Sequence, residues 1–276
     1  MSATALALAL GAAVLHAGWN LLLAGSRDTE AAAGGLLGYG FVLLAALALL
    51  TGSGVSSEAL PYVAASAALE LVYFLLLARA YRDGSVSVVY PVARGVAPAF
   101  VLCAALVGLG KGVDALAGVG VVTICCGVVL LALGEKVAHS ATKSPRPRLD
   151  VAFGLAIALA IASYTLVDAE GVERADPIAY LALVVAPAAL LYPLVTRTRP
   201  DLGMRSLATA AASFGAFLMV LLALQKAPAA PVAATRETSI LLITLFAAVF
   251  LHERLTPAKL AASAAILAGV AAIAYS

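Results

Sequence analysis

Ten apolar runs, each about as long as a membrane-spanning helix, follow one another along this chain with short connections between them. They cover residues 3–25, 31–51, 59–80, 85–109, 114–134, 150–170, 177–196, 205–225, 230–251 and 256–275. A helix needs roughly 20 apolar residues to cross a bilayer. Of the 276 residues, 63% are hydrophobic and 12% are charged, which leaves too little polar surface for a soluble domain. We therefore predict an all-α membrane protein with ten transmembrane helices.

The two halves of the chain match each other at a constant offset. Arg94 and Arg236 are 142 residues apart (236 − 94), and Gly127 and Gly269 are also 142 residues apart (269 − 127). The identity between the halves is low, but the positions correspond, which is typical of an old duplication. The halves are separated by a polar stretch with several basic residues between Gly134 and Asp150.

We therefore predict a first repeat at 1–134, a linker at 135–149 and a second repeat at 150–276. Because each repeat would hold an odd number of helices, the second must enter the membrane from the opposite side. The two repeats would then be inverted, as in many secondary transporters, whose substrate sites lie near the midplane between repeats. The short connections leave no room for an ATPase domain, so any pumping would draw on an ion or solute gradient.

Lys and Arg residues predict the orientation, because they are enriched in short cytoplasmic loops. Most of the 17 lie in the connections after the first, third, fifth, seventh and ninth runs. The connections of the other side hold Lys111, Arg174 and Lys226. We therefore expect the first set of connections to face the cytoplasm and both termini to lie outside it.

Five ionisable residues fall well inside the apolar runs: His16, Glu70, Arg94, Arg236 and Glu237. Such residues are costly in a bilayer and usually functional. A guanidinium can hold a carboxylate or phosphate by two parallel hydrogen bonds, so Arg94 and Arg236 are candidate substrate ligands. The alternative is that each pairs with Glu70 or Glu237 and holds two helices together. Glu70 is either a proton-coupling carboxylate or the fixed partner of Arg94.

Aromatic residues suggest the walls of the same site. The only tryptophan, Trp19, precedes Asn20, and at an offset of 145 (162 − 17) residues 17–20 align with 162–165, which places Tyr164 opposite Trp19. Tyr73 and Tyr90 lie near the charged residues in sequence. Aromatic walls suit small ligands with apolar parts and also face cations well. Each aromatic residue is alternatively a lipid-facing or interface residue.

Prolines predict opened backbone close to both arginines. Pro91 and Pro98 flank Arg94, and Pro228 and Pro231 precede Arg236. A proline inside a helix removes a hydrogen bond, and opened backbone within a membrane is tolerated where it lines a cavity.

Three segments resemble the drug/metabolite transporter superfamily and its EamA-type members. They are HAGWN (16–20), SVVYPVARGVAPAFV (87–101) and the stretch 236–273 that begins RETSILLITLF. The Gly/Glu signature that closes a helix in this family is present as His252–Glu253–Arg254 but has become Gly110–Lys111 in the first repeat. The resemblance implies a ten-helix fold and the export of amino acids or other metabolites, or the exchange of phosphorylated sugars. Some relatives have both termini in the cytosol, against the charge count of this chain.

We therefore predict a secondary transporter, not an enzyme, that exports an amino acid or a related carboxylate or zwitterion by alternating access. The alternatives are a proton-coupled exporter of hydrophobic cations, and a non-transport membrane protein or lipid scramblase. The chain would work as a monomer in the bilayer of a bacterial inner membrane, with no cofactor, metal or nucleic acid. The residues expected to bind substrate are Trp19, Asn20, Glu70, Tyr73, Tyr90, Arg94, Tyr164, Arg236 and Glu237.

Overall fold

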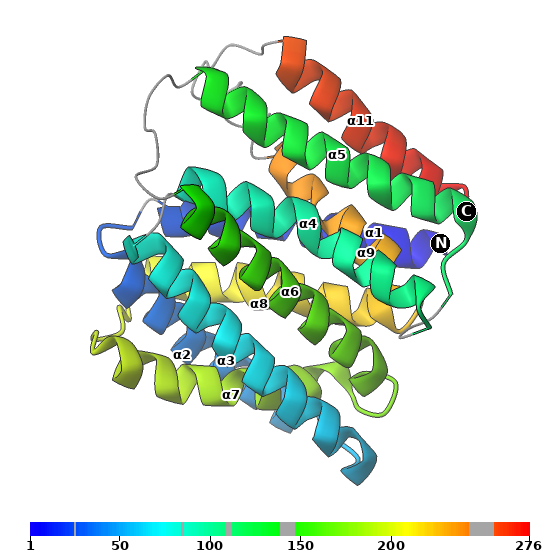
Figure 1. Cartoon of the computed structure of the whole chain (residues 1–276). Helices are drawn as coiled ribbons and strands as arrows, with labels where there is room; N and C mark the ends of the chain where they lie inside the picture. The colour runs from blue at the N-terminus through cyan, green and yellow to red at the C-terminus, as the bar shows by residue number, and fades with distance from the viewer. Residues whose placement is uncertain (25, 84–85, 109–111, 139–146, 243–256) are drawn as a thin grey trace.

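A computed structural model describes the chain except residues 25, 84–85, 109–111, 139–146 and 243–256, and the described part is helical apart from turns and one isolated bridge (Figure 1). The helices are α1 (Ala3–Ala24), α2 (Thr29–Thr51), α3 (Leu60–Asp83), α4 (Val86–Leu106), α5 (Ala115–Ala138), α6 (Pro147–Gly171), α7 (Pro177–Thr196), α8 (Met204–Leu224), α9 (Ala229–Arg236) and α11 (Pro257–Ala274), with the 3-10 turn η1 (Ser57–Ala59) before α3. They follow the expected spans closely. The expected span 230–251 is described only to residue 242, and the His252–Arg254 and Gly110–Lys111 signatures fall on residues that the structure leaves out at least in part.

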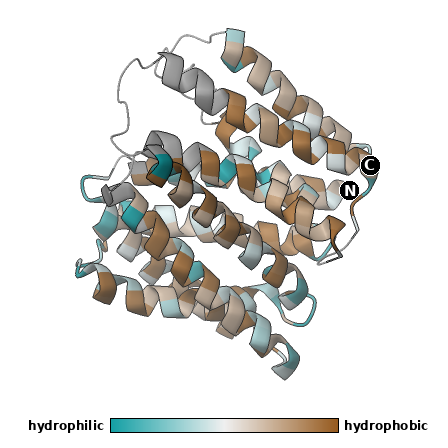
Figure 2. Ribbon diagram, in the orientation of Figure 1, coloured by the Kyte–Doolittle hydropathy of each residue, from teal (hydrophilic) through white to brown (hydrophobic). Residues whose placement is uncertain are grey.

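Seven of the described helices are long and apolar enough to cross a membrane, and α4 and α5 contain shorter apolar stretches. Large apolar side chains lie on the outer surface, including Leu49, Leu50, Leu106 and Leu194, all more than two-thirds exposed. Figure 2 shows hydrophobic residues along the helices and hydrophilic ones gathered at many of their ends. A surface of this kind is stable against lipid rather than water, so the chain is an integral membrane protein.

Local sequence explains where two of the helices begin. The carboxylate of Asp28 accepts a hydrogen bond from the amide of Ala31 and caps α2. Asp176 caps α7 in the same way, with Pro177 in the first turn, as the Asp-Pro pair predicts. Pro177 has no amide hydrogen, and none is needed at this position of a helix.

The main helix contacts join the two halves of the chain. The helices α1, α2, α3 and α5 pack on α8, α7, α6 and α11, respectively, and α4 packs on α6. Figure 1 shows α5 and α11 side by side at one edge of the molecule and α2, α3 and α7 together at the opposite edge. The core is therefore built between the halves rather than inside each of them.

The closest of these contacts, between α5 and α11, depends on glycine. A Cβ atom at Gly120 would lie 2.7 Å from the carbonyl oxygen of Gly269, and one at Gly127 would lie 2.9 Å from that of Ala262. Since Gly120 and Gly127 are two helical turns apart, they lie on one face of α5. Small residues at this spacing let helix backbones approach directly inside a membrane.

The backbone around the two central arginines differs between α4 and α9. Helix α4 continues without interruption through Pro98, although opened backbone was expected there. Pro91 and Pro98 both lie inside α4 and lack an amide hydrogen, so they leave the carbonyls of Ser87 and Arg94 without their usual donors. Helix α9, by contrast, ends at Arg236. Glu237 forms a turn, and helical structure resumes at residue 238.

The ends of α2 lie at opposite faces of the molecule, and each is tied to the other half of the chain. At one end the amide of Asp201 donates to the carbonyl of Ala31 over 2.8 Å. At the other end, Val55 and Ala175 form an isolated antiparallel bridge. The chain termini also meet, because the amino group of Met1 donates to the carbonyl of Ile273 over 3.4 Å. Both ends of the chain thus lie at one face.

Candidate functional site

A cavity of about 790 Å³ lies between the halves of the chain. This is within the range of roughly 300–1,000 Å³ that is typical of small-molecule sites. Its lining includes residues of α1, α2, α3, α4, α6, α7, α8 and α9. Arg27, Asp28, Thr29 and Glu30, from the α1–α2 connection and the start of α2, line one end, so the cavity approaches the face where this connection lies.

Two buried arginines from different helices contribute to the cavity wall. Arg94 of α4 and Arg236 of α9 are 6% and 7% exposed. Nη1 of Arg94 lies 3.2 Å from Oε1 of Glu237, and Nη2 of Arg236 lies 3.5 Å from the same oxygen. One carboxylate therefore serves two guanidinium groups. Within the described part of the chain, Nε of Arg236 and Oε2 of Glu237 are both buried without a hydrogen-bond partner.

Arg236 and Glu237 are adjacent in sequence and have opposite charges. The break in the helix after Arg236 explains how both side chains reach the same point. The amide of Glu237 bonds to the carbonyl of Ala234, three residues back, and the amide of Ile240 bonds to that of Glu237. These shorter bonds tighten the chain into a turn. Interrupted helices with polar backbone near a buried site recur in transporters.

Glu70 of α3 is the second carboxylate of the cavity and is 3% exposed. It makes no hydrogen bond or ion pair with the described residues, although it interacts electrostatically with Arg236 and Asp168. The contact expected between Glu70 and Arg94 is not formed, because Glu237 lies against Arg94 instead. Glu70 is therefore a buried carboxyl group without a direct partner among the described residues.

Aromatic rings form a continuous wall along the cavity. Ring centroids lie 6.0 Å apart between Tyr73 and Tyr164 and 6.1 Å apart between Tyr164 and Phe217. Phe74 extends the wall, with its centroid 5.1 Å from Tyr73 and 6.4 Å from Tyr192. The Tyr164–Phe217 contact is tilted, and the other three contacts are edge-to-face, the geometry that aromatic pairs prefer.

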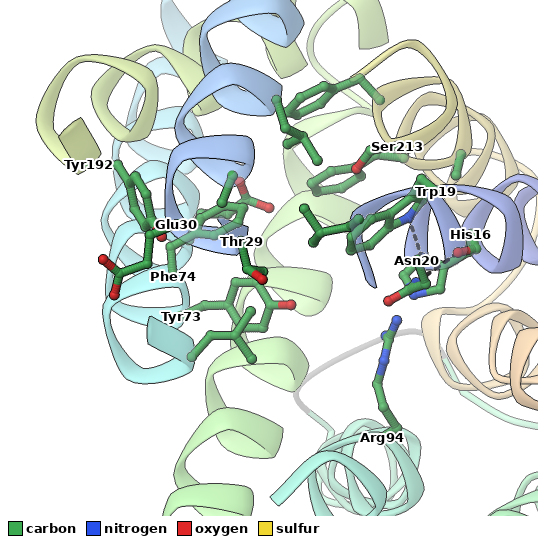
Figure 3. Close-up of a pocket in the computed structure, with 18 of the residues that line it drawn as sticks. His16, Trp19, Asn20, Thr29, Glu30, Tyr73, Phe74, Arg94, Tyr192 and Ser213 are labelled. Atoms are coloured by element: carbon green, nitrogen blue, oxygen red, sulfur yellow. Dashed lines mark hydrogen bonds between the residues drawn. The ribbon is translucent and has the colours of Figure 1, made fainter. Parts of the chain in front are cut away.

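The first helix brings three polar or aromatic side chains to the opposite wall. Nε1 of Trp19 donates to Nδ1 of His16 over 3.1 Å, and Nδ2 of Asn20 donates to the carbonyl of His16 over 2.7 Å. Figure 3 shows that Arg94 extends from α4 towards Asn20 and His16. Nε2 of His16 is buried without a partner in the described structure. His16 thus orients the indole of Trp19.

Most of the residues expected from the sequence meet in this cavity. Its lining contains Trp19, Asn20, Glu70, Tyr73, Arg94, Tyr164 and Arg236. Glu237 lies behind the arginines rather than on the lining. The side chain of Tyr90 lies outside the part of the chain that the structure describes.

The set of residues expected to bind substrate leaves out several lining residues, among them Phe74, Tyr192, Ser213 and Phe217. Phe74 is next to Tyr73, and Phe217 is one helical turn from Ser213 on α8, but apolar residues at such positions occur throughout the chain. Their spacing alone therefore does not separate them from lipid-facing residues. No group of three or more His, Cys, Asp or Glu side chains within the described residues has the arrangement of a metal site.

The described part of the chain is thus a helical membrane protein with a charged, aromatic cavity between its two halves. Comparison with known proteins supports this class. The model of the EamA-like transporter family matches residues 149–275. Residues 149–275 therefore match an EamA-like transporter domain, of the drug/metabolite transporter superfamily, as the sequence resemblance indicated.

A solved structure described only as "Crystal structure of protein" has the same fold. It superposes with a TM-score of 0.81 at 17% sequence identity, and the match covers 99% of each chain. At this identity the likeness concerns the fold alone. No curated protein matched the sequence.

Proposed function

We propose that this protein is a secondary transporter that exports a small metabolite bearing a carboxylate, and we favour an amino acid. One observation carries the proposal: two buried arginines, on α4 and at the break after α9, share a single carboxylate at the wall of the cavity. Buried charges that line a cavity within membrane helices usually mark a substrate pathway.

The arrangement of charge favours a substrate with a carboxylate. Arg236 has one contact, at 3.5 Å, and a buried Nε–H without a partner among the described residues. A guanidinium has five N–H donors and binds a carboxylate best through two of them. A substrate carboxylate would therefore bind through the donors that Arg236 leaves without a partner among the described residues.

The rest of the cavity suits the other parts of an amino acid. Glu70 has no direct partner in the described structure, so it is available to an ammonium group. Tyr73, Tyr164 and Trp19 would surround an apolar side chain. We assign substrate contact to the arginines, Glu70, Asn20 and these aromatic residues, and a supporting role to Glu237.

We further propose ten transmembrane helices in two inverted repeats. The helix contacts support this symmetry, in which α1, α2, α3 and α5 correspond to α6, α7, α8 and α11. The contact between α1 and α8 corresponds to the contact between α6 and α3, and α2 and α5 each pack on the helix that corresponds to them, α7 and α11. Exchange of the two halves leaves this set of pairs unchanged. The contact between Met1 and Ile273 places both termini at one face, as an even number of crossings requires.

Alternating access follows from the same symmetry. The cavity reaches the face of the α1–α2 connection, whereas the Val55–Ala175 bridge joins the two halves at the opposite face. Rocking of one repeat against the other would open the second face and close the first. The Lys and Arg distribution favours a cytoplasmic position for the α1–α2 face, and the membrane we propose is a bacterial inner membrane, so this conformation would load substrate for export.

A proton-coupled exporter of hydrophobic cations is the second candidate. Glu70 without a direct partner, close to the aromatic wall, is the observation that favours it. A cation would bind through Glu70 and the ring faces. Its transport would survive Arg236→Ala but not Glu70→Gln, whereas transport of the proposed amino acid would be impaired by both substitutions.

Counterflow of a labelled amino-acid panel into proteoliposomes tests the proposal. We expect saturable uptake that unlabelled substrate competes, falling at least tenfold in Arg94→Ala and Arg236→Ala and unchanged in the control Arg199→Ala, which alters an exposed arginine. Wild-type uptake in both cavity variants would overturn the assignment of the arginines. Correctly inserted protein without uptake across the panel, but with lipid exchange between leaflets, would favour a scramblase.

A further inference from the structure

A second buried polar cluster lies between α3, α6 and α7, outside the lining of the cavity. Oδ1 of Asp168 accepts hydrogen bonds from the hydroxyls of Ser66, over 2.5 Å, and Tyr180, over 2.9 Å. Each of the three residues is at most 1% exposed. The second oxygen of Asp168, Oδ2, is buried without a partner in the described part of the chain. A buried carboxylate oxygen without a donor is costly, so it calls for a functional explanation.

The cluster adjoins the cavity through α3. Ser66 and Glu70 are four residues apart and therefore lie on one face of this helix. Because Ser66 bonds to Asp168, the carboxyl groups of Glu70 and Asp168 are neighbours across the α3–α6 contact, and they interact electrostatically. Glu70 faces the cavity and Asp168 lies behind it.

Among the described buried residues at the cavity wall and in this cluster, the charges are unbalanced by one. Arg94 and Arg236 supply two positive charges, and Glu70, Asp168 and Glu237 supply three negative ones when all are ionised. Uptake of one proton by a carboxyl group makes this set neutral. Arg236 of α9, Tyr164 of α6 and Tyr180 of α7 interact electrostatically with Glu70 or Asp168. Tyr73 of α3, Arg94 of α4 and His16 of α1 line the same cavity as Glu70.

Polar groups continue from Asp168 towards the face opposite the cavity mouth. The hydroxyl of Tyr180 lies 3.5 Å from the carbonyl oxygen of Tyr62, and the guanidinium of Arg174 lies 4.8 Å from the centre of the Tyr62 ring. Arg174 belongs to the α6–α7 connection, beside the bridge that closes this face. Chains of acidic and polar groups across a membrane protein are typical of proton pathways.

We propose that Glu70 and Asp168 form the proton-binding site through which this transporter couples substrate movement to the proton gradient. The inference rests on the proposed transport function and adds the coupling ion to it. When the transporter is open at the α6–α7 face, a proton from water there adds to a carboxylate oxygen of the pair and forms an O–H bond. After the transporter has reopened at the α1–α2 face, the proton leaves to water in the cavity. It therefore moves opposite to the exported substrate, and no bond other than O–H changes.

The proposal also explains how coupling would arise. A substrate ammonium at Glu70 and a proton on the same carboxylate exclude each other. Substrate and proton would therefore bind in turn, which exchanges one for the other across the membrane. By linkage, a bound proton must weaken substrate binding by a certain factor, and bound substrate must weaken proton binding by the same factor.

The test compares two measurements on the same proteoliposomes. Counterflow at equal pH on both sides reports substrate exchange without net proton movement, and a trapped pH-sensitive dye reports proton flux when substrate moves. We expect wild type to show both. Asp168→Asn keeps the shape of the side chain, so we expect counterflow within about twofold of wild type while substrate-linked proton flux falls to the background of empty liposomes.

Three variants separate a proton site from a structural one. Asp114→Asn changes an exposed aspartate that caps α5, and we expect wild-type proton flux from it. Ser66→Ala and Tyr180→Phe each remove one hydrogen bond to Asp168 but keep its carboxyl group, so proton flux should remain with an altered pH dependence. Loss of proton flux in these two variants as complete as in Asp168→Asn would assign Asp168 a purely structural role and overturn the proposal.

The possible failures differ in their signature. Counterflow in wild type without proton flux, or with flux driven by Na⁺ instead, would overturn the proton site and leave the transport function standing. Absence of both would overturn the two proposals together. An infrared difference spectrum between acidic and neutral pH needs no substrate: we expect a protonated-carboxyl band that Asp168→Asn removes or weakens, and a spectrum identical to wild type would contradict the proposal.

Discussion

At the scale of single residues, the centre of this protein depends on one carboxylate that contacts two arginines. Oε1 of Glu237 contacts both Arg94 and Arg236, and all three side chains are buried. Removing one partner of a buried pair leaves uncompensated charge, which costs much more than the intact pair contributes. Glu237 is therefore a residue on which both stability and the geometry of the site depend.

Substitution Glu237→Gln should lower the free energy of unfolding by about 3 kcal/mol, since two buried guanidinium groups lose their shared countercharge. Reversible unfolding of the purified protein in mixed micelles, followed by circular dichroism, measures the change. Glu58→Gln, at an exposed position of η1, is the matched control and should unfold like wild type. Equal stability of both variants would show that the arginines do not need this carboxylate.

Trp19 offers a direct signal of binding. It is the only tryptophan of the chain, lines the cavity and donates a hydrogen bond to His16. A substrate that enters the cavity changes the surroundings of the indole, so we expect a saturable change of its fluorescence. The same titration of Trp19→Phe should give no change, and that of Arg236→Ala should require at least tenfold more substrate. A substrate that is transported without any change in emission would contradict the position assigned to it.

At the scale of elements, helix pairs of the two halves differ in how closely their backbones approach. The α5–α11 contact brings Gly120 and Gly269 together, so neither position has room for a side chain. Gly38 of α2 has no described neighbour within 4 Å of an added Cβ atom. The same substitution should therefore have opposite effects at the two sites.

Gly269→Ala should lower the free energy of unfolding by about 1–3 kcal/mol, because its Cβ atom would lie 2.7 Å from the carbonyl oxygen of Gly120. Gly38→Ala should leave it unchanged or raise it by up to ~1 kcal/mol, since alanine favours a helix over glycine. Thermal unfolding of the detergent-solubilised variants ranks them against wild type. A Gly269→Ala variant as stable as Gly38→Ala would mean that α5 and α11 separate without cost.

At the scale of the whole molecule, ties between the halves exist at both faces, and the cavity approaches only one of them. The Asp201–Ala31 bond and the Val55–Ala175 bridge lie at opposite ends of α2. The connections at the two faces contain exposed residues, so labelling one such residue at each face measures the orientation of the protein in the membrane directly.

Cysteines introduced at two exposed positions report this orientation in a background without Cys103, Cys125 and Cys126. We expect a membrane-impermeant maleimide to label Ser57→Cys in intact cells, and Arg199→Cys only after permeabilisation, because Arg199 lies on the arginine-rich side. The reverse pattern would place both termini in the cytosol, as in some relatives, and would make the described cavity face outward.

Much of the fold was predictable from local properties of the sequence. Each apolar run is long enough to require a helix in lipid. Asp176 followed by Pro177 favours a helix start through the local chemistry of an Asp-Pro pair. The meeting of Trp19, Glu70, Arg94 and Arg236 was also anticipated, because buried charge has few places to go in a membrane protein. In these cases a single residue or a short pattern carries the physical reason.

The remaining features depend on distances between segments far apart in the chain. Nothing in the sequence near Arg94 indicates that Glu237, rather than Glu70, lies against it. Nothing near Asp168 indicates that the hydroxyls of Ser66 and Tyr180 bond to it. The continuity of α4 through Pro98 likewise depends on neighbours that hold the helix together. Hydropathy and helix signals act within about 20 residues and decide which segments are helices. The pairing of buried charges and hydrogen bonds acts between helices, so it depends on how the helices pack.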